Sequence, residues 1–191
     1  MTSPVRRPQY AYTEYIALEE GSSIRHEYLN GEIYAMGGGS PDHAALAATV
    51  IGLLGARLPP GCRIFTSDLR IRIPNGLSTY PDAAVVCGRT ERAADDPLAV
   101  VNPVLLIEIT SKSTEPYDRG EKLRHYAHLR SVREVLIVSH REPWLTLHRR
   151  DDAEFGTPLE ARRGDSLMLE SLAARLSVDD VYGDDLEDAG R

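Results

Sequence analysis

The chain has 191 residues, of which 42% are hydrophobic, and its formal net charge is −7 at pH 7. A chain of this length can bury one good core, so we expect one domain. Every apolar run is shorter than the roughly 20 residues of a membrane helix, and the first residues lack the apolar stretch of a signal peptide, which together predict a cytoplasmic protein with no membrane contact.

The negative charge is concentrated near the C-terminus. Residues 177–191 have a net charge of −5, which leaves −2 for the rest of the chain. Nucleic-acid-binding domains are usually basic, so any contact with phosphates should be local and sensitive to salt. We expect residues 1–183 to form the domain and residues 184–191 to be an acidic, flexible tail.

The first predicted elements are a short helix and a β-hairpin. Thr13 can cap a helix that runs to about Glu20. In residues 25–36, Asn30-Gly31 joins two strand-like runs, which is the strongest short hairpin signal in a sequence.

A loop and a long helix follow. The run GGGS at 37–40 lacks the GK[ST] ending of a phosphate-binding loop, so we interpret it as a hinge or loop beside the site. Ser40 as cap and Pro41 in the first turn open an apolar helix, which residues 59–61, Pro-Pro-Gly, stop.

Strands dominate the remainder, interrupted by one more helix over residues 118–129 with Asp118 as its cap. The nearly unbroken apolar run 104–110 predicts a central strand covered on both faces. This order predicts an α/β domain around a mixed sheet. The other predicted strands are 62–68, 69–74, 80–87, 134–139 and 144–150.

The two cysteines, Cys62 and Cys87, are far apart in the sequence and form no CxxC motif. Both fall at apolar strand positions, which predicts reduced structural thiols and neither a disulfide nor a zinc site.

Two acidic residues lie in segments that otherwise read as buried strands. Asp82 precedes the apolar run 83–86, and Glu108 interrupts the run 104–110. A buried carboxylate is costly unless it is paired, hydrogen-bonded or bound to a cation. Two carboxylates that converge at a sheet edge form an anionic pocket that a hard divalent cation relieves. With the nearby ammonium of Lys122, the pair predicts a metal-dependent hydrolytic site.

The residues around this pair resemble those of a known family. The chain is similar over roughly residues 12–183 to the Uma2 family of the PD-(D/E)xK nuclease superfamily. The resemblance implies an α/β restriction-endonuclease-like fold, in which helices flank a mixed β-sheet core and a β-hairpin lies near the N-terminus. The matching segments are Tyr80-Pro81-Asp82, residues 108–114, residues 117–123 with Tyr126, HEYLNGEI, His43 and LAARLSVDDVY.

The resemblance also implies roles for individual residues. Asp82 and Glu108 would ligate the metal, and the carbonyl of Ile109 would add a ligand. Glu27, the acid of the hairpin, would lie near the same site, although a surface position fits it equally well. The metal would be Mg²⁺, with Mn²⁺ as an alternative.

The position of the lysine departs from the usual pattern of the superfamily. Thr110 stands where the lysine two residues after the acid is expected. In this family the lysine comes from the following helix, and in this chain that lysine is Lys122. A regular strand would bring Lys112 onto the face of Glu108, so Lys112 is the alternative. The serines on both sides of Lys112 indicate a turn, which favours Lys122.

Other polar residues near these motifs have structural explanations. Tyr126 has core spacing, although its hydroxyl could reach the site. His43 fits a structural role at a helix start. His125 and His128, three apart on a predicted helix, permit shared metal binding, but no third ligand stands at a convincing spacing, so a solvated helix face is preferred.

The expected function is that of a Mg²⁺-dependent endonuclease, in which water activated at the metal attacks a phosphodiester in line. The resemblance makes DNA the default nucleic acid, although the sequence does not distinguish it from RNA. A homodimer would let two sites cut two strands, and residues 25–36 offer a strand edge for pairing.

Two other functions fit parts of the sequence. The acidic body favours an inactive or specialised nuclease-fold protein that serves as a binding or assembly module, whereas the intact set Asp82, Glu108 and Lys122 favours the enzyme. A glycosidase with Asp82 and Glu108 as its acid and base would leave Lys122 unexplained.

Overall fold

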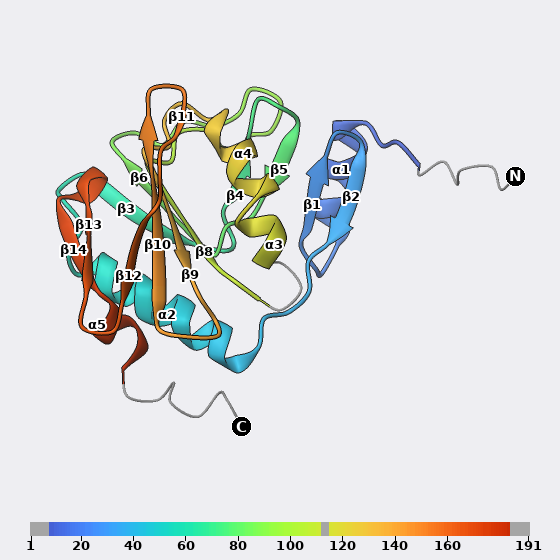
Figure 1. Ribbon diagram of the computed structural model, residues 1–191. Coiled ribbons are helices and arrows are strands. Elements are labelled where there is room, and N and C mark those ends of the chain that lie inside the picture. Colours follow the sequence, from blue (N-terminus) through green and yellow to red (C-terminus); the bar gives the residue numbers. More distant parts are fainter. Residues whose placement is uncertain (1–7, 112–114, 184–191) are drawn as a thin grey trace, which may run out of the picture.

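A computed structural model describes residues 8–111 and 115–183 (Figure 1). The predicted tail 184–191 and Lys112 lie outside the described residues. The elements, in chain order, are α1 (Tyr12–Gly21), β1 (His26–Leu29), β2 (Glu32–Ala35), α2 (Pro41–Gly55), β3 (Cys62–Thr66), β4 (Arg70–Arg72), β5 (Leu77–Thr79), β6 (Ala83–Cys87), β7 (Ala99–Val100), β8 (Leu105–Ile109), α3 (Glu115–Asp118), α4 (Glu121–Ala127), β9 (Glu134–Val138), β10 (Trp144–Asp151), β11 (Glu154–Phe155), β12 (Leu159–Arg162), β13 (Ser166–Leu169), the 3₁₀ turn η1 (Glu170–Leu172), β14 (Ala174–Ser177) and α5 (Val178–Tyr182).

The larger sheet has the strand order β11-β10-β9-β8-β6-β3, with β12 also paired to β10. Strands β8 and β9 are parallel, whereas the neighbouring pairs β6–β8 and β9–β10 are antiparallel. All residues of β8 are buried. The prediction of a mixed sheet with a covered central strand at 104–110 is therefore confirmed.

The two faces of this sheet are covered by different elements. Leu105, Ile107 and Ile109 share a core with α2, α5 and the β13–β14 pair. Leu106 belongs to a second core with Tyr126 of α4 and residues of β4 and β5. Because side chains alternate along a strand, Glu108 points to the same face as Leu106, toward α4.

A smaller sheet has the order β2-β1-β5-β4-β7. In Figure 1, α1, β1 and β2 form a lobe beside the larger sheet. Asn30 (φ 48°) and Gly31 (φ 97°) both adopt left-handed backbone conformations at the turn between β1 and β2, as a type I′ hairpin turn requires. The predicted hairpin at 25–36 is confirmed.

The start of α2 also follows the prediction. The Ser40 hydroxyl accepts the backbone N–H of His43 at 3.2 Å, and Pro41 occupies the first turn. The predicted cap of α1 was wrong, because Thr13 lies inside the helix and Ala11 is the N-cap. The Glu14 carboxylate accepts the Ala11 N–H at 2.6 Å, which is the glutamate half of a capping box, whereas the alanine at the N-cap offers no side-chain oxygen to the first turn.

The single helix predicted over residues 118–129 is two short helices. Asp118 ends α3, and Gly120 is the N-cap of α4, so the prediction of Asp118 as a cap was wrong. The chain folds closely at this break, where a Cβ on Gly120 would lie 2.9 Å from the carbonyl oxygen of Pro116.

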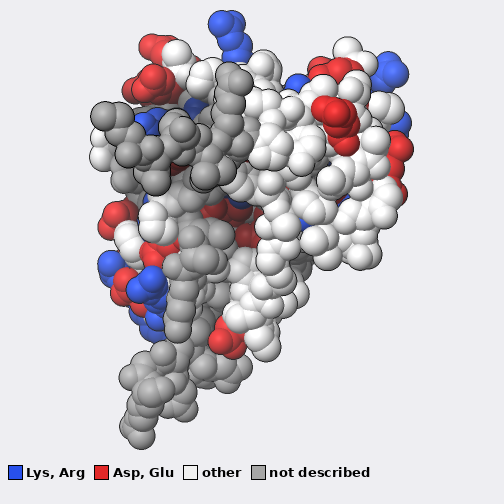
Figure 2. All heavy atoms as spheres, turned by 90° about the vertical axis from the view of Figure 1, so that its right-hand side faces the viewer, with Lys and Arg blue, Asp and Glu red and all other residues white. Residues whose placement is uncertain are grey.

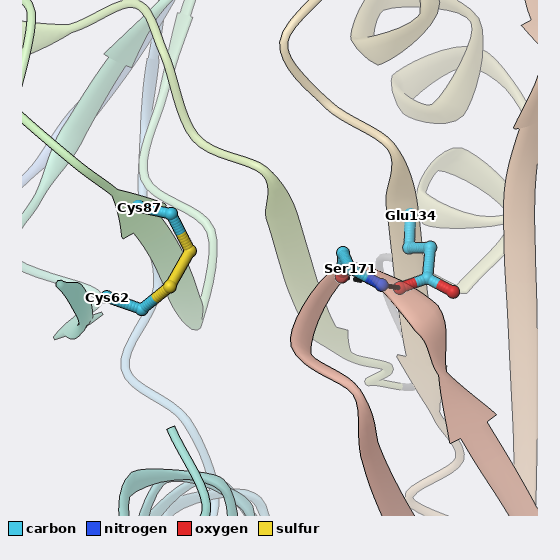
Figure 3. Close-up of a disulfide and its surroundings, with 4 residues drawn as sticks. All are labelled: Cys62, Cys87, Glu134 and Ser171. Carbon is cyan, nitrogen blue, oxygen red and sulfur yellow. Dashed lines mark hydrogen bonds between the residues drawn. A yellow bond between two sulfur atoms is a disulfide. The ribbon is translucent and has the colours of Figure 1, made fainter. Parts of the chain in front are cut away.

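The cysteine prediction was also wrong, because Cys62 and Cys87 form a disulfide (Figure 3). The two residues are direct partners in the antiparallel pairing of β3 with β6, which brings their Cα atoms to 3.9 Å. A sequence separation of 25 gives no sign of this register.

Within residues 8–111 and 115–183, no helix has both the length and the apolar character needed to cross a membrane.

Candidate active site

A cavity of about 580 Å³ lies where the hairpin lobe meets the larger sheet. Seen from the side of the lobe, Figure 2 shows acidic side chains recessed in the middle of the face. The glycine run 37–39 lines this cavity, as the interpretation of a loop beside the site requires. Its acidic lining residues are Glu27, Asp82, Glu108, Asp118 and Glu121.

Strand register brings Asp82 and Glu108 together. In the antiparallel pairing of β6 with β8, Ala83 is the partner of Ile107 and Ala84 of Leu106. One further step sets Asp82 beside Glu108. The Asp82 carboxylate also accepts the backbone N–H of Ile109 at 2.7 Å, which fixes it at the end of the strand.

Glu108 is a buried acid with 4% of its surface exposed. Its Oε1 atom lies 3.0 Å from Nζ of Lys122 and accepts a hydrogen bond from the hydroxyl of Tyr126. Burial raises the pKa of Glu108 to about 8; Lys122 opposes this rise, whereas the nearby carboxylate of Asp82 adds to it.

Lys122 reaches this acid from the first turn of α4 and is 5% exposed. Its Nζ atom also lies 3.4 Å from Oε1 of Glu27 and 3.8 Å from Oδ1 of Asp118. Burial alone would lower the pKa of Lys122, but the surrounding acids, Glu108 first among the side chains, hold it well above its usual value. The side chain is therefore an ammonium held among three acidic side chains.

Glu27 lies in the site and not on the outer surface of the hairpin. Its side chain is 15% exposed and accepts a hydrogen bond from the Thr79 hydroxyl. The pairing of β1 with β5, in which Tyr28 faces Ser78, puts Glu27 opposite Thr79 when the register is continued by one residue.

The chain contains a useful contrast to Glu108 in Glu134, which is 2% exposed. The Glu134 carboxylate accepts the backbone N–H of Ser171 at 2.9 Å, as Figure 3 shows. It also accepts the backbone N–H of Glu170 at 3.0 Å and pairs with Arg149 at 3.0 Å. It is a structural acid satisfied within the protein. In the described part of the chain, Glu108 has only the ammonium and the phenol as partners, and it faces a cavity.

His43 is a site residue that the sequence reasoning treated as structural only. Its Nε2 atom lies 3.1 Å from the Ile109 carbonyl oxygen and 3.4 Å from Oδ2 of Asp82. The hydrogen bond with Asp82 raises the pKa of His43, and burial opposes this rise. The cap at Ser40 and Pro41 fixes the helix start, but no sequence signal links that start to the end of β8.

The donor atoms at this point fit a hard divalent cation. The carboxylates of Asp82 and Glu108 and residue Ile109 line one cavity, and carboxylate and carbonyl oxygens are the ligands that such a cation prefers. Among the described residues, no group of three His, Cys, Asp or Glu side chains is arranged to hold a metal. A centre here would therefore take a main-chain oxygen as well as side chains.

The remaining candidates lie elsewhere or serve other purposes. Tyr126 is buried in the core, and its hydroxyl reaches the site. His125 and His128 are not among the residues that line the cavity. Their Nδ1 atoms lie 2.7 and 3.2 Å from Nδ2 of Asn75.

A mixed sheet with two acids side by side on adjacent strands and a lysine from the next helix defines a restriction-endonuclease-like protein. The sequence model of the Uma2 family, described as "Putative restriction endonuclease", matches residues 12–179. The chain belongs to the Uma2 family.

Two related proteins and one solved structure are similar to this chain. Two uncharacterised proteins of Synechocystis are similar: slr1290 is 36% identical over 177 residues, covering 92% of both chains, and sll1609 is 31% identical over 129 residues, covering 65% of this chain and 72% of its own. The fold is shared with a crystal structure from Anabaena variabilis described as "a putative nuclease belonging to DUF820". That match has a TM-score of 0.73 and 18% identity, and covers 89% of this chain and 96% of the other.

Proposed function

We propose that this protein is a metal-dependent endonuclease that hydrolyses phosphodiester bonds of nucleic acid, with DNA as its substrate. The observation that carries the proposal is the placing of two carboxylates, Asp82 and Glu108, and the buried ammonium of Lys122 at one cavity. The family description supports the same reaction class. A cytoplasmic location and a homodimer that cuts two strands belong to the same proposal.

Asp82, Glu108 and the Ile109 carbonyl would hold Mg²⁺ or Mn²⁺, which when bound stabilises negative charge on a phosphoryl oxygen and lowers the pKa of water. Lys122 is held in place by Glu27, Glu108 and Asp118, so its ammonium can orient the attacking water without reorganising. The same positive charge offsets the negative charge that develops in the transition state.

The acidic lining of the cavity favours a second candidate, a nuclease-fold module that binds or assembles without cutting. A polyanion does not approach several carboxylates readily unless cations offset them. Cleavage therefore separates the two candidates.

The test is incubation with supercoiled plasmid, linear duplex DNA, single-stranded DNA and RNA at low salt, in Mg²⁺, Mn²⁺ or EDTA. We expect the wild type to cut DNA with either metal and not in EDTA, and Glu108→Gln to be inactive. Glu160→Gln, at an exposed position of β12, is the matched control and should keep full activity. Failure of the wild type to cut any of these substrates with either metal would favour the binding module.

A further inference from the structure

His43 is fixed at the rim of the cavity by the start of α2. The Ser40 cap holds the backbone N–H of His43, and the side chain is 18% exposed. A Cβ on Gly39 would lie 2.7 Å from Nδ1 of His43, so the glycine run passes close to that edge of the ring. The opposite edge, which carries Nε2, faces the end of β8.

Two of the predicted metal donors converge on this one nitrogen. The Ile109 carbonyl oxygen is 3.1 Å and Asp82 Oδ2 is 3.4 Å from Nε2. A neutral imidazole has one N–H, which can be shared with only one of these oxygens at good geometry. The same Asp82 oxygen, Oδ2, also accepts the N–H of Ile109 at 2.7 Å, so it already has one donor besides His43.

We propose that His43 is a ligand of the catalytic metal through Nε2, together with Asp82 and the Ile109 carbonyl. The proposal rests on the function proposed above and puts a nitrogen donor beside the Asp82 carboxylate and the Ile109 carbonyl oxygen. An imidazole offers a lone pair at Nε2 when its proton is on Nδ1, so a bond from Nε2 to the metal would replace the present contacts of Nε2 with the two oxygens.

A nitrogen donor changes which metal the site prefers. Mg²⁺ is bound mainly through oxygen, whereas imidazole suits first-row transition metals. The site therefore binds Mn²⁺ more tightly than Mg²⁺, and the difference depends on His43.

The experiment loads metal-free wild type and His43→Gln with Mn²⁺ in the absence of nucleic acid. Pulsed electron paramagnetic resonance then records coupling of the Mn²⁺ electrons to directly bound ¹⁴N. Glutamine keeps an N–H donor, so a side chain that only positions Asp82 by hydrogen bonding would be replaced adequately. His125→Gln, which changes an imidazole outside the cavity, is the control.

We expect imidazole ¹⁴N coupling in the wild type and in His125→Gln but not in His43→Gln. We also expect His43→Gln to lose more than about tenfold in Mn²⁺ affinity and much less in Mg²⁺ affinity, as calorimetry would show. Mn²⁺ bound to the wild type without ¹⁴N coupling, or with the same affinity in His43→Gln, would overturn the role of His43 alone. A wild type that binds neither metal would overturn the proposed metal centre as well.

Discussion

Glu108 is an acid within a strand whose five residues are all buried. Isolated, such a carboxylate costs several kcal/mol, and the partners supplied by the protein are the ammonium of Lys122 and the hydroxyl of Tyr126. Glu134 shows that this fold can satisfy a buried acid with backbone N–H groups. The arrangement at Glu108 is better explained by chemistry in the cavity than by stability.

The raised pKa of Glu108, about 8, predicts how stability depends on pH in the absence of metal. A carboxyl whose folded pKa exceeds its unfolded value stabilises the fold at low pH, and this contribution is lost as the pH rises from about 4.5 to 8. Glu108→Gln keeps the shape of the neutral form, so its free energy of unfolding should fall less than that of the wild type between pH 5 and pH 8.

Urea denaturation in EDTA across this range measures the difference. Parallel pH profiles for the two proteins would contradict the raised pKa.

Substitution of Lys122 tests which lysine acts. Lys122→Met should reduce cleavage by about 10² to 10³ by removing the charge that stabilises the transition state. It should leave Mn²⁺ binding intact or stronger, because a nearby positive charge is lost. Lys112→Met is the matched variant, and we expect it to cut normally.

Steady-state cleavage rates and calorimetric metal titration measure both effects. A loss of activity in Lys112→Met with normal cutting by Lys122→Met would assign the role to the other lysine.

The acids could be found from the sequence and His43 could not, for a physical reason. An acid inside an apolar strand is visible in one segment, because its burial follows from its neighbours, as at Glu108. The contact of His43 with Ile109 depends on how α2 packs across the end of β8, which is a tertiary contact between segments 66 residues apart.

At the scale of elements, the disulfide joins β3, at the edge of the larger sheet, to β6, which leads back to Asp82. It closes a loop with a sequence separation of 25, which corresponds to roughly 3 kcal/mol of stability in the chain-entropy description. We expect the free energy of unfolding of Cys62→Ser/Cys87→Ser to be lower than that of the oxidised wild type by about this amount, with a correspondingly lower denaturation midpoint.

Denaturation of the wild type with and without dithiothreitol provides the companion measurement. The reductant should lower the denaturation midpoint of the wild type and leave that of the double variant unchanged. Equal midpoints for the oxidised and reduced wild type would contradict a contribution of the disulfide to the free energy of unfolding.

The sequence predicted an element correctly where the residues of its turn or its helix cap are themselves characteristic. Asn30-Gly31 specified the hairpin, and Ser40-Pro41 specified the start of α2. The break between α3 and α4 was missed because Gly120 stands within an otherwise helical pattern, and glycine is tolerated there. The smaller sheet as a separate unit was not foreseen: the strand predicted at 69–74 contains β4, but β5 and β7 have only three and two residues, too few to show a period.

At the scale of the whole molecule, the charge is unfavourable for a protein that acts on a polyanion. The net charge is −7, and the cavity is lined by five acids with Lys122 as the only lysine among its lining residues. A divalent cation at Asp82 and Glu108 would offset part of this negative charge and give a phosphate a positive group to contact. Binding of DNA should therefore require the metal and weaken as salt rises.

The central claim is that Asp82 helps to hold a divalent metal ion and that this bound ion is required for cleavage. The most direct measurement titrates Mn²⁺ into the wild type and Asp82→Asn and follows, on the same samples, metal binding by calorimetry and cutting of duplex DNA at low salt. We predict that the wild type binds and cuts over the same range of metal concentration, and that Asp82→Asn loses both while it remains folded by circular dichroism. Cutting by Asp82→Asn at the wild-type rate, or a wild type that neither binds Mn²⁺ nor cuts, would contradict the account.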